Sequence, residues 1–171
     1  MSKIGPLLLD TNIWLDLYLA ERPGHACASR LFRLAAEHDI TLLYAIGTIK
    51  DVYYLACSHL KRSARAANGG VLTEGAATAA EEVAVSIAAN MDSQATAVGA
   101  DRSDVWTAIR QRGIHRDLED NMIVAASMRA GASVLVTNDE RLLRHCMVAA
   151  HTAEDTCRWI EGAATICSDI V

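Results

Sequence analysis

The feature that most constrains the fold is a short apolar run near the N-terminus, Leu7–Leu9, which ends abruptly at Asp10. Consecutive large apolar residues predict a strand buried on both faces, which is typical of parallel sheets. In open α/β sheets, ligands bind at the carboxyl ends of the strands. We therefore expect Asp10, with the small polar residues Thr11 and Asn12 that follow it, to lie at the mouth of a site.

Similar apolar runs recur along the chain and alternate with segments of helical periodicity. Strand-like runs lie at 40–46 and 133–137, with shorter candidates at 95–98 and 147–149. Helical spacing of apolar residues fills the intervals and predicts the order β-α-α-β-α-α-β-α-α-β-α-β-α. This order predicts an α/β fold, a three-layer α/β/α sandwich with a central, mostly parallel sheet of four to five strands.

The length of 171 residues fits one domain, since domains usually contain ~100–200 residues. The chain has no internal repeat and no low-complexity linker, so we expect a single domain over residues 1–171. The five cysteines form no CxxC pair, which indicates reduced thiols and a cytoplasmic protein. No run approaches the ~18 apolar residues of a membrane span, and the N-terminal segment lacks the apolar stretch of a signal peptide, so no membrane partner is expected.

A net charge of −5 argues against a general nucleic-acid-coating protein, whose charge is strongly basic. It does not argue against a nucleic-acid enzyme, because a cluster of catalytic acids contributes to that negative sum. The candidate residues for binding substrate phosphates are Arg116 and Arg141, which lie close in sequence to the acidic positions.

The predicted topology gathers acids from distant parts of the chain at one edge of the sheet. Asp10 and Asp139 each follow a predicted parallel strand directly, while Asp51 and Asp120 lie in the first turn of helices that begin at the same edge. Right-handed crossovers return every strand in the same sense, so these positions converge. Asp117, three residues before Asp120, faces the same side of its helix.

Carboxylates gathered in a partly buried site repel one another, so they need a counter-ion or must take up protons. Oxygen ligands of this kind suit Mg²⁺ or Mn²⁺, which activate water and clamp a phosphodiester during in-line displacement. We expect Asp10, Asp120 and Asp139 to be metal ligands, directly or through water, and Asp51 to bind the metal or orient the attacking water. The short polar neighbours able to fix water and phosphate oxygens are Thr11, Asn12, Thr137 and Asn138.

Each acid also has an ordinary structural interpretation. Taken singly, Asp51, Asp117 and Asp120 are more commonly helix caps or dipole partners than ligands, and Asp139 is equally suited to cap the next helix. Asp10 is harder to explain in this way, because a turn after three leucines needs no acid. The set as a whole is therefore much more specific than any one member.

Three stretches resemble the motifs of PIN-domain nucleases, the family of the VapC-like toxin ribonucleases. Residues 7–16 resemble the opening of the family, residues 117–126 its third-acid helix, and residues 134–139 the strand that delivers its fourth acid. The motifs occur in the family's order and span nearly the whole chain. The resemblance implies a metal-dependent endoribonuclease that cleaves single-stranded RNA, often the toxin of a type II toxin–antitoxin pair.

The same resemblance implies catalytic or metal-binding roles for Asp10, Asp51, Asp120 and Asp139, with Mg²⁺ or Mn²⁺ as cofactor. The second position departs from the pattern, because the family commonly has Glu where this chain has Asp51. The implied partners are an RNA substrate, an antitoxin protein and a second copy in a homodimer. An alanine-rich segment at 72–90, longer than compact members need, is interpreted as a helical clip or dimerisation surface.

Two other functions stay open from the sequence. If Asp51 is a defect, the chain is a catalytically impaired PIN-like domain that binds RNA or a protein. The run that ends in Asp10 and Thr11 is also similar to haloacid-dehalogenase-like phosphotransferases. Those enzymes need a second Asp two residues after the first, where this chain has Asn12, so this option is disfavoured.

Overall fold

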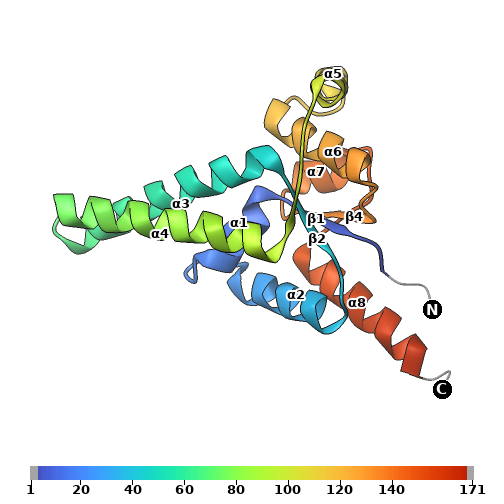
Figure 1. The fold of residues 1–171 in the computed structure, drawn as a ribbon, viewed down its shortest axis with the longest axis horizontal. Helices are drawn as coiled ribbons and strands as arrows, with labels where there is room; N and C mark the ends of the chain where they lie inside the picture. Colours follow the sequence, from blue (N-terminus) through green and yellow to red (C-terminus); the bar gives the residue numbers. More distant parts are fainter. Residues whose placement is uncertain (1–3, 169–171) are drawn as a thin grey trace.

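Five parallel strands form one sheet at the centre of the molecule (Figure 1). The computed structural model describes residues 4–168, with side chains described to residue 163. The sheet has the order β3-β2-β1-β4-β5, so β1 lies between β2 and β4. The strands are β1 (Leu7–Leu9), β2 (Leu42–Ala45), β3 (Thr96–Val98), β4 (Val134–Val136) and β5 (Ala150–His151).

Helices cover both faces of this sheet (Figure 1). One face is covered by α1 (Thr11–Tyr18), α2 (His25–Glu37) and α8 (Ala153–Ser168), and the other by α6 (Leu118–Ala130) and α7 (Glu140–His145), with α5 (Arg102–Gln111) packed on α6. The predicted three-layer α/β/α sandwich is therefore confirmed, and the order of elements along the chain matches the prediction.

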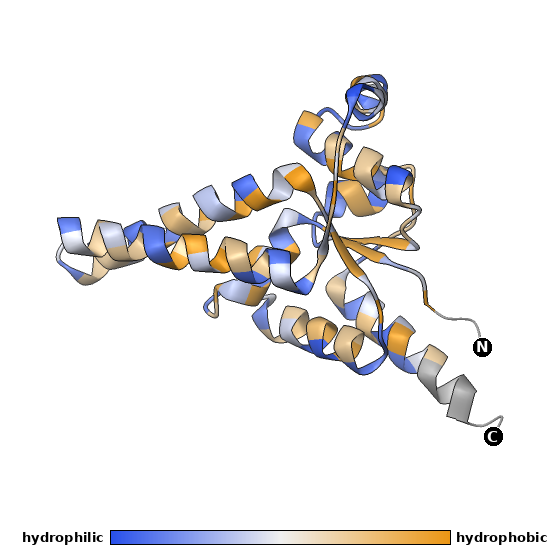
Figure 2. Cartoon of the chain, viewed as in Figure 1, coloured by the Kyte–Doolittle hydropathy of each residue, from blue (hydrophilic) through white to orange (hydrophobic). Residues whose placement is uncertain are grey.

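The central strand explains why both faces are covered. Leu7 and Leu9 belong to one hydrophobic core, which includes Trp14 of α1, whereas Leu8 belongs to a second core with Ile123 of α6. Successive side chains of a strand point to opposite faces, so an unbroken apolar run is stable only where both faces are dry. Figure 2 shows the same distribution, with hydrophobic residues concentrated on the strands and polar residues along the outer surfaces of the helices.

Two long helices, α3 (Ile46–Ala67) and α4 (Glu74–Gln94), pack against each other and project away from the sheet as an arm (Figure 1). The turn between them contains Gly69 and Gly70 at φ values of 61° and 93°, a left-handed region that glycine adopts without steric cost. In the part of the chain that the structure describes, no helix is both long enough and apolar enough for a membrane span.

The start of α3 differs from the prediction. Thr48, with Asp51 three residues later, has the local signature of a helix N-cap, and this signature predicts a start at Thr48. The chain instead passes from β2 into the helix at Ile46, with Ala45 in the N-cap position and no side-chain cap. Thr48 is therefore inside the helix, and Asp51 lies in the second turn rather than the first. The local capping signal was overridden because β2 ends directly against the helix and leaves no linker.

Two smaller differences concern β5 and α5. The last strand is Ala150–His151 rather than 147–149, and it pairs with β4 through Leu135 and Val136. The sequence offers Ser103 or Asp104 as the cap of α5, whereas the helix begins at Arg102 with Asp101 as its cap, and Asp101 and Asp104 form a reciprocal capping box.

Replacing Leu8 with alanine should lower the free energy of unfolding by about 2–5 kcal/mol, because it removes a fully buried side chain at the centre of the sheet. The matched control is Leu55→Ala on α3, where the leucine is 49% exposed and the cost should be below about 1 kcal/mol. Urea denaturation followed by circular dichroism measures both variants. Equal losses would contradict the central position of Leu8.

Candidate metal centre

Asp10 lies where β1 ends and caps the N-terminus of α1. The residue is only 4% exposed. Its carboxylate accepts hydrogen bonds from the backbone N–H of Thr11, from Nδ2 of Asn12 and from Oγ1 of Thr137, each at 2.6 Å. Because Thr137 follows β4, this network joins the carboxyl ends of two neighbouring strands and fixes the orientation of the carboxylate.

The hydroxyl of Thr137 is the centre of this network. It donates to Asp10 and accepts from Nδ2 of Asn12 at 3.1 Å and from the backbone N–H of Asp139 at 3.0 Å. A threonine hydroxyl has one proton and two lone pairs, so its hydrogen-bonding capacity is fully used. The side-chain Oδ1 of Asn12 also accepts a hydrogen bond from the backbone N–H of Asn138 at 3.0 Å, and this bond connects the loop after β4 to α1.

Asp139 caps α7, as its structural interpretation predicts. Its Oδ1 accepts from the backbone N–H groups of Arg141 and Leu142, at 2.6 and 3.3 Å. The amide of Asn138 donates to Asp16 at 3.0 Å, and its oxygen accepts from the backbone of α8 at 3.4 Å. The side chain of Asn138 therefore anchors the loop that presents Asp139.

Asp120 lies in the first turn of α6, and Asp117 is the N-cap, accepting from the backbone N–H of Glu119 at 2.9 Å. The side chain of Asp120 is 22% exposed, and its Oδ2 lies 3.5 Å from Nε2 of His115. His115 is buried, and nothing in the sequence pattern indicates that it lies near the acids. Its ring, in the loop that precedes α6, contacts the carboxylate of Asp120.

Asp10 is electrostatically coupled to other acids at this edge. Its pKa is raised to about 6, chiefly by burial and also by the charges of Asp139 and Glu119, which together outweigh the hydrogen bonds from Thr137 and Thr11 that lower it. The carboxylate is therefore held in place by strong donors, and yet its ionised form is disfavoured by its surroundings.

Asp120 shows the same balance. Its pKa is also raised to about 6, first by burial and then by the charges of Asp117, Asp10 and Asp139, whereas His115 lowers it. The structure thus brings Asp10, Asp120 and Asp139 within electrostatic range of one another from three separate parts of the chain.

Glu119 and Asp51 form the other end of the acidic cluster. Burial raises the pKa of Glu119, and the negative charge of Asp51 is the next cause, while Lys50 opposes it. Lys50 lies 3.2 Å from Asp51. Glu119 was not among the residues singled out from the sequence, although it lies inside the acidic first turn of α6.

The two candidate substrate-binding arginines are both exposed. Arg116 lies in the loop that leads into α6, and Arg141 lies in the first turn of α7, directly after Asp139 and Glu140. Both are on segments that carry the acids, and neither reaches Asp10 through a hydrogen bond among the contacts of the described residues.

The chemistry of these donors fits a divalent cation. Among the described residues, no three acidic, histidine or cysteine side chains already form a coordination group. Mg²⁺ is usually held by one or two carboxylates and keeps several water molecules, so a complete protein cage is not required. Asp10 and Asp120, whose pKa values are raised partly by neighbouring negative charge, are the acids that a cation would stabilise most directly.

Two solved structures are similar in fold to this chain. The chain is similar in structure to the VapBC2 complex of Rickettsia felis bound to a DNA fragment from its promoter, with a TM-score of 0.59, 15% identity, and coverage of 85% of this chain and 97% of that one. It is also similar to VapC20 of Mycobacterium tuberculosis, a toxin that cleaves the sarcin–ricin loop, with a TM-score of 0.53, 17% identity, and coverage of 75% and 86%. No curated protein sequence gave a significant match.

At these identities the two structures establish a common fold. The sequence itself matches the profile of the PIN domain over residues 6–141, which include every acid of the cluster from Asp10 to Asp139. With most of its length matched, and with its acids at the edge where the strands end, the chain belongs to the PIN domain family.

Proposed function

We propose that this protein is a divalent-metal-dependent endoribonuclease that hydrolyses phosphodiester bonds in RNA. The observation that carries the proposal is the pair formed by the buried carboxylate of Asp10 and the half-buried carboxylate of Asp120, whose pKa values are both raised to about 6. Perturbed acids that share one edge of a parallel sheet are typical of catalytic sites. Membership of the PIN domain family supports nuclease chemistry.

In this proposal, Asp10, Asp120 and Asp139 hold Mg²⁺ or Mn²⁺. When bound, such an ion supplies charge stabilisation at the phosphate and a water molecule of lowered pKa. Thr137 keeps Asp10 in a fixed orientation through its 2.6 Å hydrogen bond, so the carboxylate does not need to reorganise. Asp51, with 20% of its side chain exposed beside the cluster, is assigned to orient the attacking water.

The remaining polar groups serve to position the substrate. The exposed guanidinium groups of Arg116 and Arg141 are assigned to bind RNA phosphates, which arginine recognises with paired hydrogen bonds. Asn12 contributes indirectly, because its amide bridges Asp10 and Thr137. The nuclease therefore rests on a rigid acidic centre with cationic groups on the neighbouring loops.

We also propose that the protein is the toxin of a type II toxin–antitoxin pair. The likeness to the Rickettsia felis VapBC2 complex supports an antitoxin protein as partner. The arm of α3 and α4, which contains the alanine-rich segment 72–90, is proposed as the contact surface for this partner or for a second copy in a homodimer. The cytoplasm is the proposed location, because an RNA-cleaving toxin needs access to cellular RNA and the described cysteines are free thiols.

A second candidate is a PIN-like domain that binds RNA or a protein without cleaving. The observation that favours it is the ion pair of Asp51, whose Oδ1 lies 3.2 Å from Nζ of Lys50. A carboxylate neutralised in this way is less available to a metal or a water molecule. The two candidates differ in whether cleavage occurs at all.

Asp10→Asn should reduce cleavage of single-stranded RNA in Mn²⁺ by at least about 100-fold, because it removes charge from the proposed metal site while nearly preserving side-chain volume. The matched control is Asp155→Asn at the exposed start of α8, which should cleave like the wild type. Gel electrophoresis of a labelled RNA, with EDTA as a further control, measures the rate. Cleavage that survives either EDTA or Asp10→Asn would reject the nuclease; RNA binding without cleavage would favour the second candidate.

Asp51→Glu separates the two candidates in another way. If Asp51 already serves the reaction, glutamate should not create an activity that the wild type lacks, and Asp51→Asn should slow cleavage without weakening RNA binding. If Asp51 is a defect, Asp51→Glu should switch cleavage on. The same gel assay, run alongside binding in EDTA, distinguishes these outcomes.

The metal-free protein should become less stable as pH rises from about 4 to about 7. A raised carboxyl pKa means that the folded state binds the proton more tightly than the unfolded chain, so Asp10 and Asp120 stabilise the fold fully below their ordinary value of 3.8 and lose this contribution as pH passes about 6. Thermal unfolding across this range measures the effect, and Asp120→Asn should flatten it.

The same experiment with Mn²⁺ tests the proposed cation. Since the metal competes with protons for the same oxygens, the increase in Tm caused by Mn²⁺ should be larger at about pH 7.5 than at about pH 5. The increase should shrink in both Asp10→Asn and Asp120→Asn, but not in Asp155→Asn. An equal increase in all three variants would place the bound metal elsewhere.

A further inference from the structure

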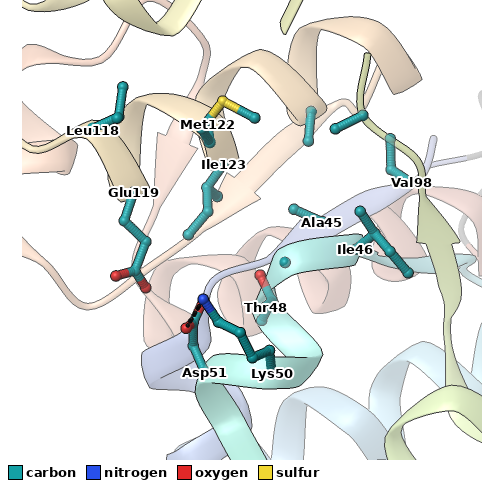
Figure 3. Close-up of a pocket in the computed structure, with 13 residues that line it drawn as sticks. Ala45, Ile46, Thr48, Lys50, Asp51, Val98, Leu118, Glu119, Met122 and Ile123 are labelled. Carbon is teal, nitrogen blue, oxygen red and sulfur yellow. Dashed lines mark ion pairs between the residues drawn. The ribbon is translucent and has the colours of Figure 1, made fainter. Parts of the chain in front are cut away.

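A cavity of about 330 Å³ lies directly beside the acidic cluster (Figure 3). It lies between the N-terminal turns of α3 and the first half of α6, at the carboxyl ends of β2 and β3. Its walls are largely apolar and include Ile46, Val98 and Met122, whereas Asp51 and Glu119 lie together at one side. This volume falls within the range of pockets that take small organic groups.

One polar group in the wall of the cavity has no hydrogen-bond partner among the residues that the structure describes. Thr48 is 2% exposed, and the unpaired atom is its Oγ1. Figure 3 shows the hydroxyl end of Thr48 directed into the space between α3 and α6. A buried hydroxyl without a partner costs free energy, so a group in the cavity that reached Oγ1 with a donor or an acceptor would be stabilised there.

We propose that this cavity binds one unstacked nucleobase of single-stranded RNA. The inference rests on the proposed function, which already implies single-stranded RNA, and adds a binding site for one base of that RNA. A base has apolar faces, which suit side chains such as Met122 and Ile46, and a polar edge, which suits the Thr48 hydroxyl as donor or acceptor. Enzymes that hold a displaced base use this combination of apolar packing and edge hydrogen bonds.

The position of the cavity supports a nucleotide as its occupant. Asp51 and Glu119 both line the cavity and both belong to the acidic cluster. A base in the cavity is separated from its own phosphate only by a ribose, so the phosphate falls beside the acids that are proposed to act on it. Lys50, with 67% of its side chain exposed at the rim, provides a cation for the RNA backbone.

The Thr48 hydroxyl also discriminates between a base and an apolar side chain of a protein partner. A leucine or phenylalanine from a partner would fill the apolar part of the cavity but would leave Oγ1 without a hydrogen bond. A nucleobase satisfies both the apolar walls and the hydroxyl. The cavity therefore favours a base, and a partner's side chain is the alternative that the experiment must exclude.

The test compares two single-stranded RNA octamers, one with normal bases and one that is abasic, with binding measured by fluorescence anisotropy in EDTA so that no cleavage occurs. The wild type should bind the base-bearing octamer about tenfold or more tightly than the abasic one. Thr48→Val should weaken binding of the base-bearing octamer by about 3–10-fold and leave the abasic octamer unchanged. Thr48→Ser, which keeps the hydroxyl, should restore most of the affinity.

A second variant fills the cavity. Gly47 lies in its wall, and a Cβ added there meets no atom within 4 Å, so the backbone accepts a side chain at this position and Gly47→Leu adds bulk at the cavity. This variant should abolish most of the difference between the two octamers. Its control is Gly75→Leu on α4, where an added Cβ also meets nothing within 4 Å. The control for Thr48→Val is Thr107→Val, which lines a different cavity of about 360 Å³ beside Trp106.

Equal affinity of the wild type for both octamers, or unchanged base-dependent binding in Gly47→Leu, would overturn the assignment and leave a partner's apolar side chain as the occupant. Equal weakening of both octamers by Thr48→Val would also overturn it, because the effect would then be structural. Cleavage in Mn²⁺ is scored separately. Base-dependent binding without cleavage rejects the nuclease but supports the base site. Cleavage without base-dependent binding supports the nuclease but rejects the base site.

Discussion

The burial of the Asp10 carboxylate at the end of the central strand is the constraint on which the rest of the site depends. An ionised carboxylate is expensive to bury unless donors replace its water, and here Thr11, Asn12 and Thr137 each donate at 2.6 Å. These bonds come from α1 and from the end of β4, so the same contacts that satisfy the carboxylate also fix the two neighbouring strands in register at the edge where the site lies.

The donors do not remove the electrostatic cost. Even with three hydrogen bonds, the pKa of Asp10 is raised to about 6, because burial and the charges of Asp139 and Glu119 outweigh them. The two hydrophobic cores offset this cost: Leu7 and Leu9 pack into one core and Leu8 into the other, so apolar burial stabilises both faces of the sheet while the electrostatic cost lies at its edge. A rigid scaffold with a destabilised polar edge is the arrangement expected of a site that gains stability only when it binds a ligand.

Much of this arrangement was predictable, because the strands are short apolar runs with no polar alternation. Leu7–Leu9 could only be a strand covered on both faces, and its abrupt end marked Asp10 as a residue at the sheet edge. The parallel topology then placed Asp139 nearby, because it follows β4, which pairs with β1. These inferences depend on residues close in sequence and on rules of sheet geometry, and both kinds of information are present in a single chain.

The parts that were not predictable depend on how helices pack against each other. Glu119 and His115 lie near the other acids because α6 and the loop before it pack at this edge, and no periodicity in the sequence predicts such packing.

Thr48 carries the local signature of a helix cap, yet the helix begins before it, at Ile46, and its hydroxyl is left at the wall of a cavity. This failure of a local rule is informative. The direct passage of β2 into α3 accounts for the position of Thr48 inside the helix, and it leaves this residue in the wall of the cavity that α3 and α6 enclose beside the acids. Because the same two helices carry Asp51 and Glu119, any displacement of α6 relative to α3 changes the shape of the cavity and the spacing of the acids together. Recognition of a base and chemistry at its phosphate would then be coupled through one helix pair.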